Sequence, residues 1–517
     1  MKRNLLFIIA LFVCALTFGQ GELDAYRYSS SDLSGTARGQ AMGGAFGALG
    51  GDMTGVAINP AGIGVYRSSE IVANMSLTSP IIRGITNSES NTSFHFDNLS
   101  YVGYYPIIKG SMLSLNFGFN YNRIKSFDQR YSASGSKMNA SLTDYMAYLT
   151  NGINHSTWDN ENLYKNPNIP WLSILAWDGY LINPGNGNND YSSLLDPGEQ
   201  VSPNLKVSEK GQIETYDFTI GSNISNKFYW GATITITELS YLMNSSYDES
   251  FLGPAGGGFT LENFLKSEGS GIQFKAGIIY RPTDVLRLGL SYHSPTWYTM
   301  TDYFRARLTP RGIYGNDGKL VEYTETPTDD DNTTTASTNY ILRTPGRWTL
   351  SAAAVLSTQA ILSLDYEITN YASMNLKDDN GNDWKDVNSI INEDFKNTST
   401  IRTGFELRFT PQFSGRIGAA WSQNPYQSDI KSLGDIALPA GTIPNYTLSD
   451  DVYYITSGVG FRFTPQFYMD FALVYRTQKD YLYYFPTDVG IPSLTDSFAG
   501  TFTNKTLKGL LTFGYKF

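Results

Sequence analysis

The stretch SGTARGQAMGGAFGALGGDMTGVAINPAGIGVYR, residues 34–67, decides how the rest of the chain is interpreted. Ten of the thirty residues from Gly35 to Gly64 are glycine, and six of them recur at every fourth position up to Gly55. Glycine has no Cβ, so its backbone can pack closely against a neighbouring wall. The four-residue spacing predicts that these glycines lie along one side of helical turns. We therefore expect this stretch to form a compact plug that fits inside a larger surrounding structure.

Two other interpretations agree less well with these residues. A flexible linker is usually rich in serine and charge, whereas this stretch carries the apolar residues Met42, Phe46 and Leu49. A phosphate-binding loop would need GxGxxG, or a Lys-Ser/Thr pair after the glycines, and neither is present. Near its end the stretch contains Asn59-Pro60-Ala61-Gly62, which is typical of a rigid turn.

Residues 1–20 have the pattern of a secretory signal peptide. Lys2 and Arg3 are followed by an apolar run at positions 5–18, which is too short to span a bilayer as a helix. The only cysteine, Cys14, lies in this segment. We therefore expect an exported mature chain without disulfides or a cysteine metal site.

The composition favours one large closed sheet over two or three soluble domains. Aromatic residues make up 14 %, with 36 Tyr and 29 Phe, whereas charged residues make up only 17 %. The mean hydropathy is −0.26, and no apolar run after the signal peptide is long enough for a transmembrane helix. An exported chain of this kind is typical of an outer-membrane β-barrel, whose strands hide their hydrophobicity by alternation. The net charge of −10 argues against nucleic acid as a partner.

Alternation with a period of two is clear in residues 113–122. Apolar Leu115 and Phe117 alternate there with polar Asn116 and Asn120, so the two faces of this strand meet different surroundings. We expect Phe117 to face lipid and Asn116 to face a wet lumen. Similar alternation recurs at residues 272–281, 401–409 and 467–476.

Six short turns predict the number of strands. Two of them lie in nearly identical frames, LRFTPQF at 407–413 and FRFTPQF at 461–467. Six hairpins give about twelve strands, and one further segment at each end raises the number to about fourteen, an even number as in bacterial barrels. The turns are expected at residues 106–109, 225–227, 282–284, 357–360, 410–412 and 464–466, and the end segments at 69–79 and 503–517.

Two long loops on the opposite, extracellular side carry apolar segments. The loop predicted at 124–211 contains IPWLSILAW at 169–177. The loop predicted at 243–270 contains FTLENFL at 259–265, whose spacing suggests a short amphipathic helix. Both segments fit either self-packing of the loops or a landing site for an apolar ligand.

The plug, the short turns and the strand number together resemble the FadL/TodX family of outer-membrane transporters for hydrophobic molecules. The resemblance is carried by Asn59-Pro60-Ala61, which matches the family's hatch motif, and by the hairpin AGIIYRPTDVLRLGLSYHSPT at 276–296. It implies an all-β fold, a transmembrane antiparallel barrel of about fourteen strands at residues 68–517 with an N-terminal hatch at residues 21–67. The expected location is the bacterial outer membrane.

The resemblance also implies a route for the ligand. Family members capture a hydrophobic ligand between extracellular loops, pass it to a site beside the hatch and release it sideways at a kinked third strand. Here that strand would be 111–123, with Gly118 as the weak point because glycine leaves a strand without side-chain packing. The loops of this chain are longer and richer in Asn and Asp than those of the best-studied members, so ligand identity does not carry over.

We therefore predict a passive, monomeric channel in contact with outer-membrane lipid, taking up hydrophobic small molecules such as long-chain fatty acids or aromatic hydrocarbons. It should need neither cofactor nor metal. The alternative is a permanently plugged barrel whose loops bind a protein partner, for example in secretion; a continuous apolar cavity between the loops and residues 42–61 would favour the channel. An enzyme is not expected, because the only local Ser/His candidate is His293 with its neighbouring serines, and GxSxG is absent.

The candidate site residues follow from this hypothesis. The inward cations Lys275, Arg287, Arg402 and Arg416 could hold a ligand carboxylate. Equally, they could anchor the hatch through Asp52 or pair with Asp365, Glu367 and Glu406, and this structural role is favoured for each residue. The hatch motif is Asn59, Pro60, Ala61 and Gly62, and the candidate ligand contacts are Met42, Phe46, Leu49, Trp171, Leu172, Trp177, Phe259, Phe264, Lys275 and Arg287.

Overall fold

The computed structural model describes residues 21–84, 92–160, 163–166, 168–327, 336–356, 359–427, 430, 441–486 and 497–517. The predicted signal peptide and Cys14 lie outside the described residues, as does part of the turn expected at 357–360.

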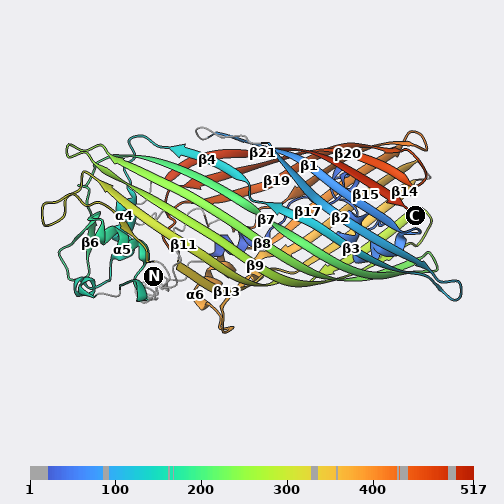
Figure 1. Ribbon diagram of the computed structural model, residues 1–517, viewed down its shortest axis with the longest axis horizontal. Helices are drawn as coiled ribbons and strands as arrows, with labels where there is room; N and C mark the ends of the chain where they lie inside the picture. The colour runs from blue at the N-terminus through green and yellow to red at the C-terminus, as the bar shows by residue number, and fades with distance from the viewer. Residues whose placement is uncertain are drawn as a thin grey trace, which may run out of the picture.

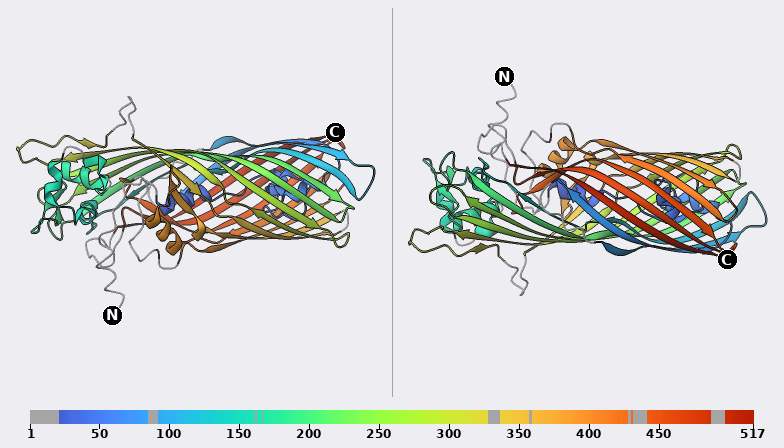
Figure 2. Two further views of the ribbon diagram at one scale, coloured as in Figure 1. Left: turned by 90° about the horizontal axis from the view of Figure 1, so that it is seen from below. Right: turned by 90° about the horizontal axis from the view of Figure 1, so that it is seen from above.

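The chain forms one closed antiparallel β-barrel with its N-terminal segment inside (Figures 1 and 2). Strand β1 (Glu70–Arg83) pairs with β2 (Ser93–Pro106) on one side and with the last strand, β21 (Phe498–Lys516), on the other, which closes the sheet. The barrel has fourteen strand positions, which confirms the predicted fold class and strand number.

Strands follow one another around the barrel in chain order, and four positions are each occupied by two strands in line. The order continues with β3 (Met112–Ser126) and its continuation β4 (Gln129–Ser134), β7 (Val201–Ile224), β8 (Phe228–Phe251), β9 (Gly258–Tyr280), β10 (Leu286–His293) with β11 (Trp297–Arg311), β13 (Ala336–Arg343) with β14 (Arg347–Leu356), β15 (Ala360–Asn370) with β16 (Asn375–Asp378), β17 (Asn397–Arg408), β18 (Phe413–Ser422), β19 (Tyr446–Arg462) and β20 (Phe467–Tyr483).

Short helices and small strands occupy the lumen and one end of the barrel. None of the helices in the described part of the chain is long and apolar enough to cross a membrane. In chain order these elements are α1 (Glu22–Ser29), α2 (Ala37–Ala41), α3 (Met53–Ile58), η2 (Pro60–Val65), α4 (Leu142–Thr150), η3 (His155–Asp159), η4 (Leu163–Lys165), α5 (Trp171–Asp178), β5 (Ile182–Pro184), β6 (Tyr191–Ser193), β12 (Thr324–Glu325), η5 (Tyr371–Ser373) and α6 (Lys385–Asp394).

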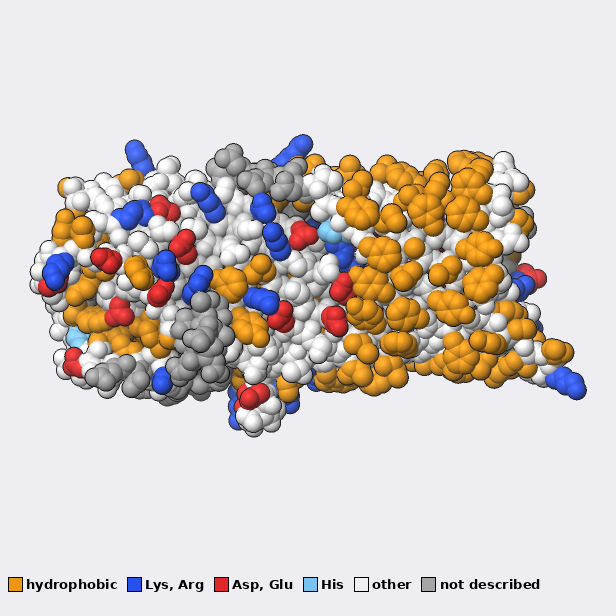
Figure 3. Space-filling view, in the orientation of Figure 1, with side chains coloured by type: hydrophobic (Ala, Val, Ile, Leu, Met, Phe, Trp, Pro, Cys, Tyr) orange, Lys and Arg blue, Asp and Glu red, His pale blue; other side chains and the backbone are white. Residues whose placement is uncertain are grey.

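A belt of exposed apolar side chains surrounds the half of the barrel that carries the short turns. Figure 3 shows this belt on one face, with charged side chains gathered beyond it. The belt arises from the alternation in the sequence, because every second residue of a strand points outward. Phe117 belongs to it and is 43 % exposed, as predicted, together with residues such as Ile71, Phe218, Ile234, Ile236, Ile272, Leu350, Leu364, Ile401, Ile455 and Phe471.

Beyond the belt, strands β7, β8, β9 and β11 continue as a long wall toward the opposite end, which we call the loop end (Figure 1). The predicted loop 243–270 is therefore wrong, as is the helix at 259–265 inside it. Residues 258–280 form one strand with ladder partners on both sides, in β8 and β11, so that Phe259, Leu261 and Leu265 point inward with a period of two. The predicted loop 124–211 is shorter too, because β4 and the start of β7 take up its two ends.

The inside of the loop end is filled by one apolar core. Inward residues of the long wall, such as Leu205 and Leu308, pack with Leu142 of α4 and with Leu172 and Leu175 of α5. The N-terminal helix α1 joins the same core through Leu23, Ala25 and Tyr28. Most of the apolar segment at 169–177 is therefore buried against other residues of the protein.

Candidate functional site

The hatch, residues 21–67, lies in the lumen as a series of short helical turns joined by glycines. Gly43, Gly44, Gly50 and Gly51 have positive φ, a conformation that ends helical turns and favours glycine. The predicted alignment of the glycines along one side of helical turns is therefore wrong. The hatch glycines instead face different neighbours, including Thr54 of the hatch and Ser351 of the wall.

The side chain of Asn59 forms hydrogen bonds to two parts of the hatch and to the barrel wall. Its side-chain amide donates to the carbonyl oxygens of Gly47, at 2.8 Å, and of Ile278 in β9, at 3.1 Å. Its side-chain oxygen accepts from the backbone N–H of Ala61, at 3.1 Å, which caps the following helix η2. The motif thus joins the end of α3 to the barrel wall and forms the rigid turn expected from the sequence.

Inward glycines of the wall make room for the hatch backbone. A Cβ at Gly231 of β8 would overlap the carbonyl of Pro60, and one at Gly418 of β18 would overlap the backbone of Gly43. Gly118 of β3 is similar, because a Cβ there would lie 2.7 Å from Cδ1 of Ile63. The hatch and the wall are therefore fitted to each other at backbone distance.

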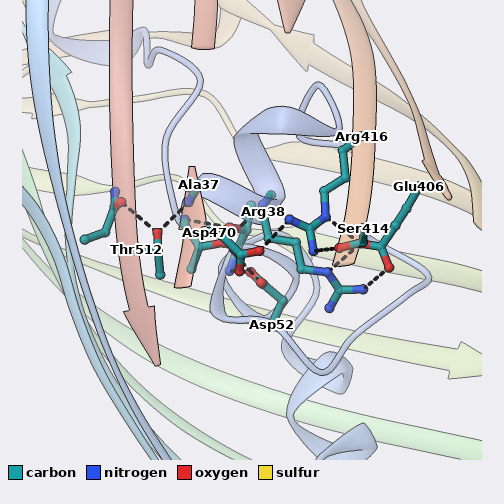
Figure 4. Close-up of polar contacts among 12 residues, drawn as sticks. Ala37, Arg38, Asp52, Glu406, Ser414, Arg416, Asp470 and Thr512 are labelled. Carbon is teal, nitrogen blue, oxygen red and sulfur yellow. Dashed lines mark hydrogen bonds and ion pairs between the residues drawn. The ribbon is translucent and has the colours of Figure 1, made fainter. Parts of the chain in front are cut away.

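A charged latch holds the hatch near the turn end of the barrel (Figure 4). Arg38 of α2 donates from Nε and Nη2 to the two carboxylate oxygens of Glu406, at 2.9 and 3.1 Å. Arg416 donates to the same carboxylate at 2.7 Å and to Asp470 at 2.5 Å. The backbone N–H of Ala37 donates to the Thr512 hydroxyl at 2.8 Å.

The wall also binds hatch backbone groups directly. Asp365 accepts from the N–H groups of Phe46 and Gly47, at 3.0 and 2.9 Å. Arg287 donates to the carbonyl of Leu49, at 2.6 Å. His293 is hydrogen-bonded through Nε2 to the carbonyl of Ile58, at 2.9 Å, and its ring is used in holding the hatch.

Asn116 also faces the hatch rather than a wet lumen. It is fully buried, and its side-chain amide donates to the carbonyl of Ile63 at 2.6 Å. The expectation that this position faces water is therefore wrong, because the hatch fills the lumen at this level.

A chamber of about 450 Å³ lies between the hatch and the apolar core of the loop end. Hatch residues 54, 57 and 58 contribute to its walls, as do α1 and the segment 29–34 that follows it. Lys275, which lines the chamber, is paired with Asp217 at 2.9 Å. Among the described residues, the chamber walls combine charged, polar and apolar side chains. The chamber is therefore not the continuous apolar cavity that would have favoured a channel over a plugged barrel.

Two chamber cations hold the segment Ser29–Ser31, which we call the strap. Arg347 of β14 donates to the carbonyl of Ser29 at 3.1 Å and to the Ser31 hydroxyl at 2.9 Å. Lys125 of β3 donates to the carbonyl of Arg27 at 2.6 Å and also contacts the Ser30 hydroxyl. In the described part of the chain, neither cation forms an ion pair with a carboxylate; their partners are neutral oxygens.

The chamber extends to a part of the barrel wall where β2 and β3 no longer pair with each other. The ladder between these strands ends at the Asn98–Asn122 rung, whereas β3 continues alongside β7 with a register shift between Arg123 and Lys125. Chamber residues lie on both sides of this separation, Ser93 on β2 and Ser126 on β3. Gly118, the predicted weak point, has ladder partners on both sides, Val102 and Thr219.

The structure brings only one of the predicted ligand contacts into the chamber. Lys275 lines it, and Arg287 lies below it, bonded to the hatch. Phe264 points outward from β9 at the loop end, away from the chamber. The other seven are packed inside the hatch (Met42, Phe46 and Leu49) or belong to the loop-end core (Trp171, Leu172, Trp177 and Phe259).

Arg347 and Lys125 are the site residues that the sequence argument did not identify. The signal for Arg347 was present, because alternation with outward Trp348 places it on the inner face of its strand. No sequence pattern indicated the strap that both cations bind.

Comparisons with known proteins agree with this architecture. Residues 255–483 match the model of a family described as outer membrane protein transport protein (OMPP1/FadL/TodX). A search of curated proteins finds no match to the chain.

Solved structures share the fold at low sequence identity. A FadL homologue from Pseudomonas aeruginosa superposes with a TM-score of 0.54 and 14 % identity, covering 94 % of this chain and 99 % of the homologue. A variant of the TodX monoaromatic hydrocarbon channel superposes with a TM-score of 0.50 and 12 % identity, covering 93 % and 98 % of the two chains. The family match and the shared fold confirm the predicted resemblance of this chain to the FadL/TodX outer membrane transport proteins.

Proposed function

We propose that the barrel is a passive outer-membrane channel that takes up hydrophobic small molecules carrying an anionic head group, with the hatch as its gate. The observation that carries this proposal is the strap, which is held in the chamber by two cations whose partners are neutral oxygens. The family match supports transport, and the chemistry of the chamber supports this class of cargo.

An anionic head group would compete with the strap for Arg347 and Lys125. The strap offers these cations neutral oxygens, whereas a carboxylate adds a full negative charge and hence Coulombic attraction, so a carboxylate is the better partner. Binding of the head group would therefore release the strap, which connects α1 to the rest of the hatch. We infer that this release loosens the hatch from above while the latch at Arg38 holds it from below.

The apolar tail of such a cargo needs a route that avoids water. The separation of β2 and β3 beyond Asn122 is lined by polar residues and by the apolar Ile124, and the ion pair of Arg123 with Asp97, at 2.7 Å, still bridges it. Phe94 and Phe96 of the belt are exposed on the outside of β2. Exit there leads into the membrane, whereas entry into aqueous periplasm would cost about 0.8 kcal/mol per exposed CH₂. We place the lateral gate at this separation rather than at Gly118.

Binding of dodecanoate and of uncharged dodecanol to the purified barrel tests the role of the cations. Arg347→Gln should weaken dodecanoate binding roughly tenfold, the equivalent of one charge-assisted hydrogen bond, and should leave dodecanol binding unchanged. Arg343→Gln is the matched control, because this arginine is exposed at the end of β13. Equal losses for both ligands, or no loss for either, would contradict the assignment of the head-group site.

One observation favours the rival function, a plugged barrel that binds a protein partner. The loop end is filled by the apolar core that includes α1, α4 and α5, so a cargo entering from outside has to displace packed side chains. Failure of the wild-type barrel to bind either dodecanoate or dodecanol would favour this second function.

A further inference from the structure

A shallow groove of about 650 Å³ lies on the outer face of the long wall, away from the chamber and the hatch. It crosses β4, β7, β8, β9 and β11 where these strands extend beyond the apolar belt. One row of outward positions across the groove is Arg130, Ser208, Asn244, Phe264 and Arg305, which are ladder partners in successive strands. The next row toward the loop end carries Lys206, Glu262 and Arg307.

The groove is cationic on a protein that is acidic as a whole. It is lined by four cations, Arg130, Lys206, Arg305 and Arg307, and by one carboxylate, Glu262, whereas the chain carries a net charge of −10. Lys206 and Arg305 are exposed, and Arg307 is 47 % exposed and paired with Glu325. Figure 3 shows basic side chains, interspersed with acidic ones, on the surface beyond the belt. Such a patch attracts anions against the overall charge of the molecule.

The height of the groove above the belt indicates what surrounds it. From Ile236, in the belt, to Asn244, in the groove, β8 rises roughly 20 Å along the barrel axis, because a residue adds about 3.3 Å and the strands tilt by about 40°. This level lies above the acyl chains of the outer leaflet, at the height of the saccharides that outer-leaflet glycolipids carry on their head groups.

We propose that this groove binds the anionic core saccharide of the lipopolysaccharide molecules that surround the barrel. Arginine and lysine would bind phosphate and carboxylate groups of the saccharide. The amide of Asn244 and the hydroxyls of Ser208 and Ser246 would bind sugar hydroxyls. Half-buried Phe264 offers an apolar ring for the C–H face of a sugar. Phe264, which does not face the lumen, would thus contribute to saccharide binding.

The proposal is tested with the intact barrel in detergent and a phosphorylated core oligosaccharide released from lipopolysaccharide by mild acid. The test variant is Lys206→Gln with Arg305→Gln. The control is Lys319→Gln with Lys385→Gln, which removes the same charge from exposed positions of a loop and of α6. Calorimetric titration is carried out at low and at physiological ionic strength.

We expect the test variant to bind the oligosaccharide roughly tenfold more weakly than the wild type, as befits the loss of two exposed charge contacts, and the control to bind as the wild type does. Binding should weaken with salt and on chemical removal of the phosphates. Equal binding by the test variant and the wild type would overturn the proposal, as would equal binding of the dephosphorylated oligosaccharide. Tighter binding of polyglutamate than of the oligosaccharide would assign the groove to an acidic protein instead.

Discussion

At the residue scale, several inward charges of this barrel hold the hatch, including Glu406, Asp365 and Arg287. Alternation in the sequence correctly placed Arg402, Arg416 and Glu406 on inner faces, because the period of a strand is two. Glu367 and Glu406 were among the carboxylates expected to pair with these cations, and they do pair with Arg402 and Arg416. Alternation did not identify Arg38, which reaches Glu406 across hundreds of residues of chain, because no local pattern encodes that contact. These inward residues, which were also candidates for ligand binding, therefore have structural roles.

The first prediction concerns the latch. Glu406→Gln removes the carboxylate shared by half-buried Arg38 and buried Arg416, which keeps only its pair with Asp470. Breaking a buried ion pair typically costs about 3–5 kcal/mol. We expect hatch opening to be more frequent, seen as increased ion conductance in planar bilayers. Glu325→Gln is the control, because its pair with Arg307 is exposed and should contribute little. Unchanged conductance of the Glu406 variant would remove the latch from the gating scheme.

The second prediction concerns pH and the loop end. Burial raises the pKa of Glu249 from 4.5 to about 7, at the end of β8 beyond the belt, where its carboxylate accepts from the N–H of Leu142 and the hydroxyl of Tyr247. Because the folded state holds the proton more tightly, the stabilisation is complete below about pH 4.5 and is lost as the pH rises through about 7. Burial also raises the pKa of neighbouring Asp144, which acts in the same direction.

Hydrogen exchange of α4 measures this effect. Protection of residues 142–150, corrected for the intrinsic rates, should be greater at pH 5 than at pH 8, and Glu249→Gln should reduce the difference. A pH dependence that is the same in the variant would show that another group is responsible.

At the scale of elements, the strands and turns were predictable and the path of the hatch was not. Proline and polar residues at tight turns identified the hairpins, and the Asn-Pro-Ala turn was visible as local chemistry. The apolar residues at 259–265 fitted a helical spacing as well as an alternating one, and only the ladders to β8 and β11 decided between them. The course of the hatch depends on which wall glycines it meets, a long-range fit that glycine spacing cannot encode.

The third prediction belongs to strands β2 and β3. Asn98 and Asn122 form the last rung before these strands separate, and cross-strand neighbours are close enough for a disulfide. Asn98→Cys with Asn122→Cys should slow dodecanoate uptake when oxidised and restore it on reduction. The chain has no other cysteine beyond Cys14 of the predicted signal peptide, so no native disulfide complicates the experiment.

Its control is the same pair of substitutions in reducing buffer throughout, which separates the effect of the covalent bridge from the loss of two amides. Uptake that is indifferent to oxidation would place the exit elsewhere in the wall.

At the scale of the whole molecule, the barrel consists of three levels stacked along its axis. The latched hatch fills the lumen within the belt, the polar chamber lies above it, and the apolar core closes the loop end. Composition and alternation predicted the part of the barrel that carries the apolar belt, because strands in contact with lipid expose apolar side chains on their outer face. They did not predict the chamber, whose polarity arises from inward residues of strands that are far apart in sequence.

The most direct test of the central claim is the initial rate of radiolabelled dodecanoate uptake by cells that lack a hydrophobic-compound channel of their own. Cells carrying the wild-type barrel should take up dodecanoate several-fold faster than cells without it, while uptake of acetate, which has no apolar tail, should not change. Equal dodecanoate uptake with and without the barrel, once its folded presence in the outer membrane is verified, would contradict the account.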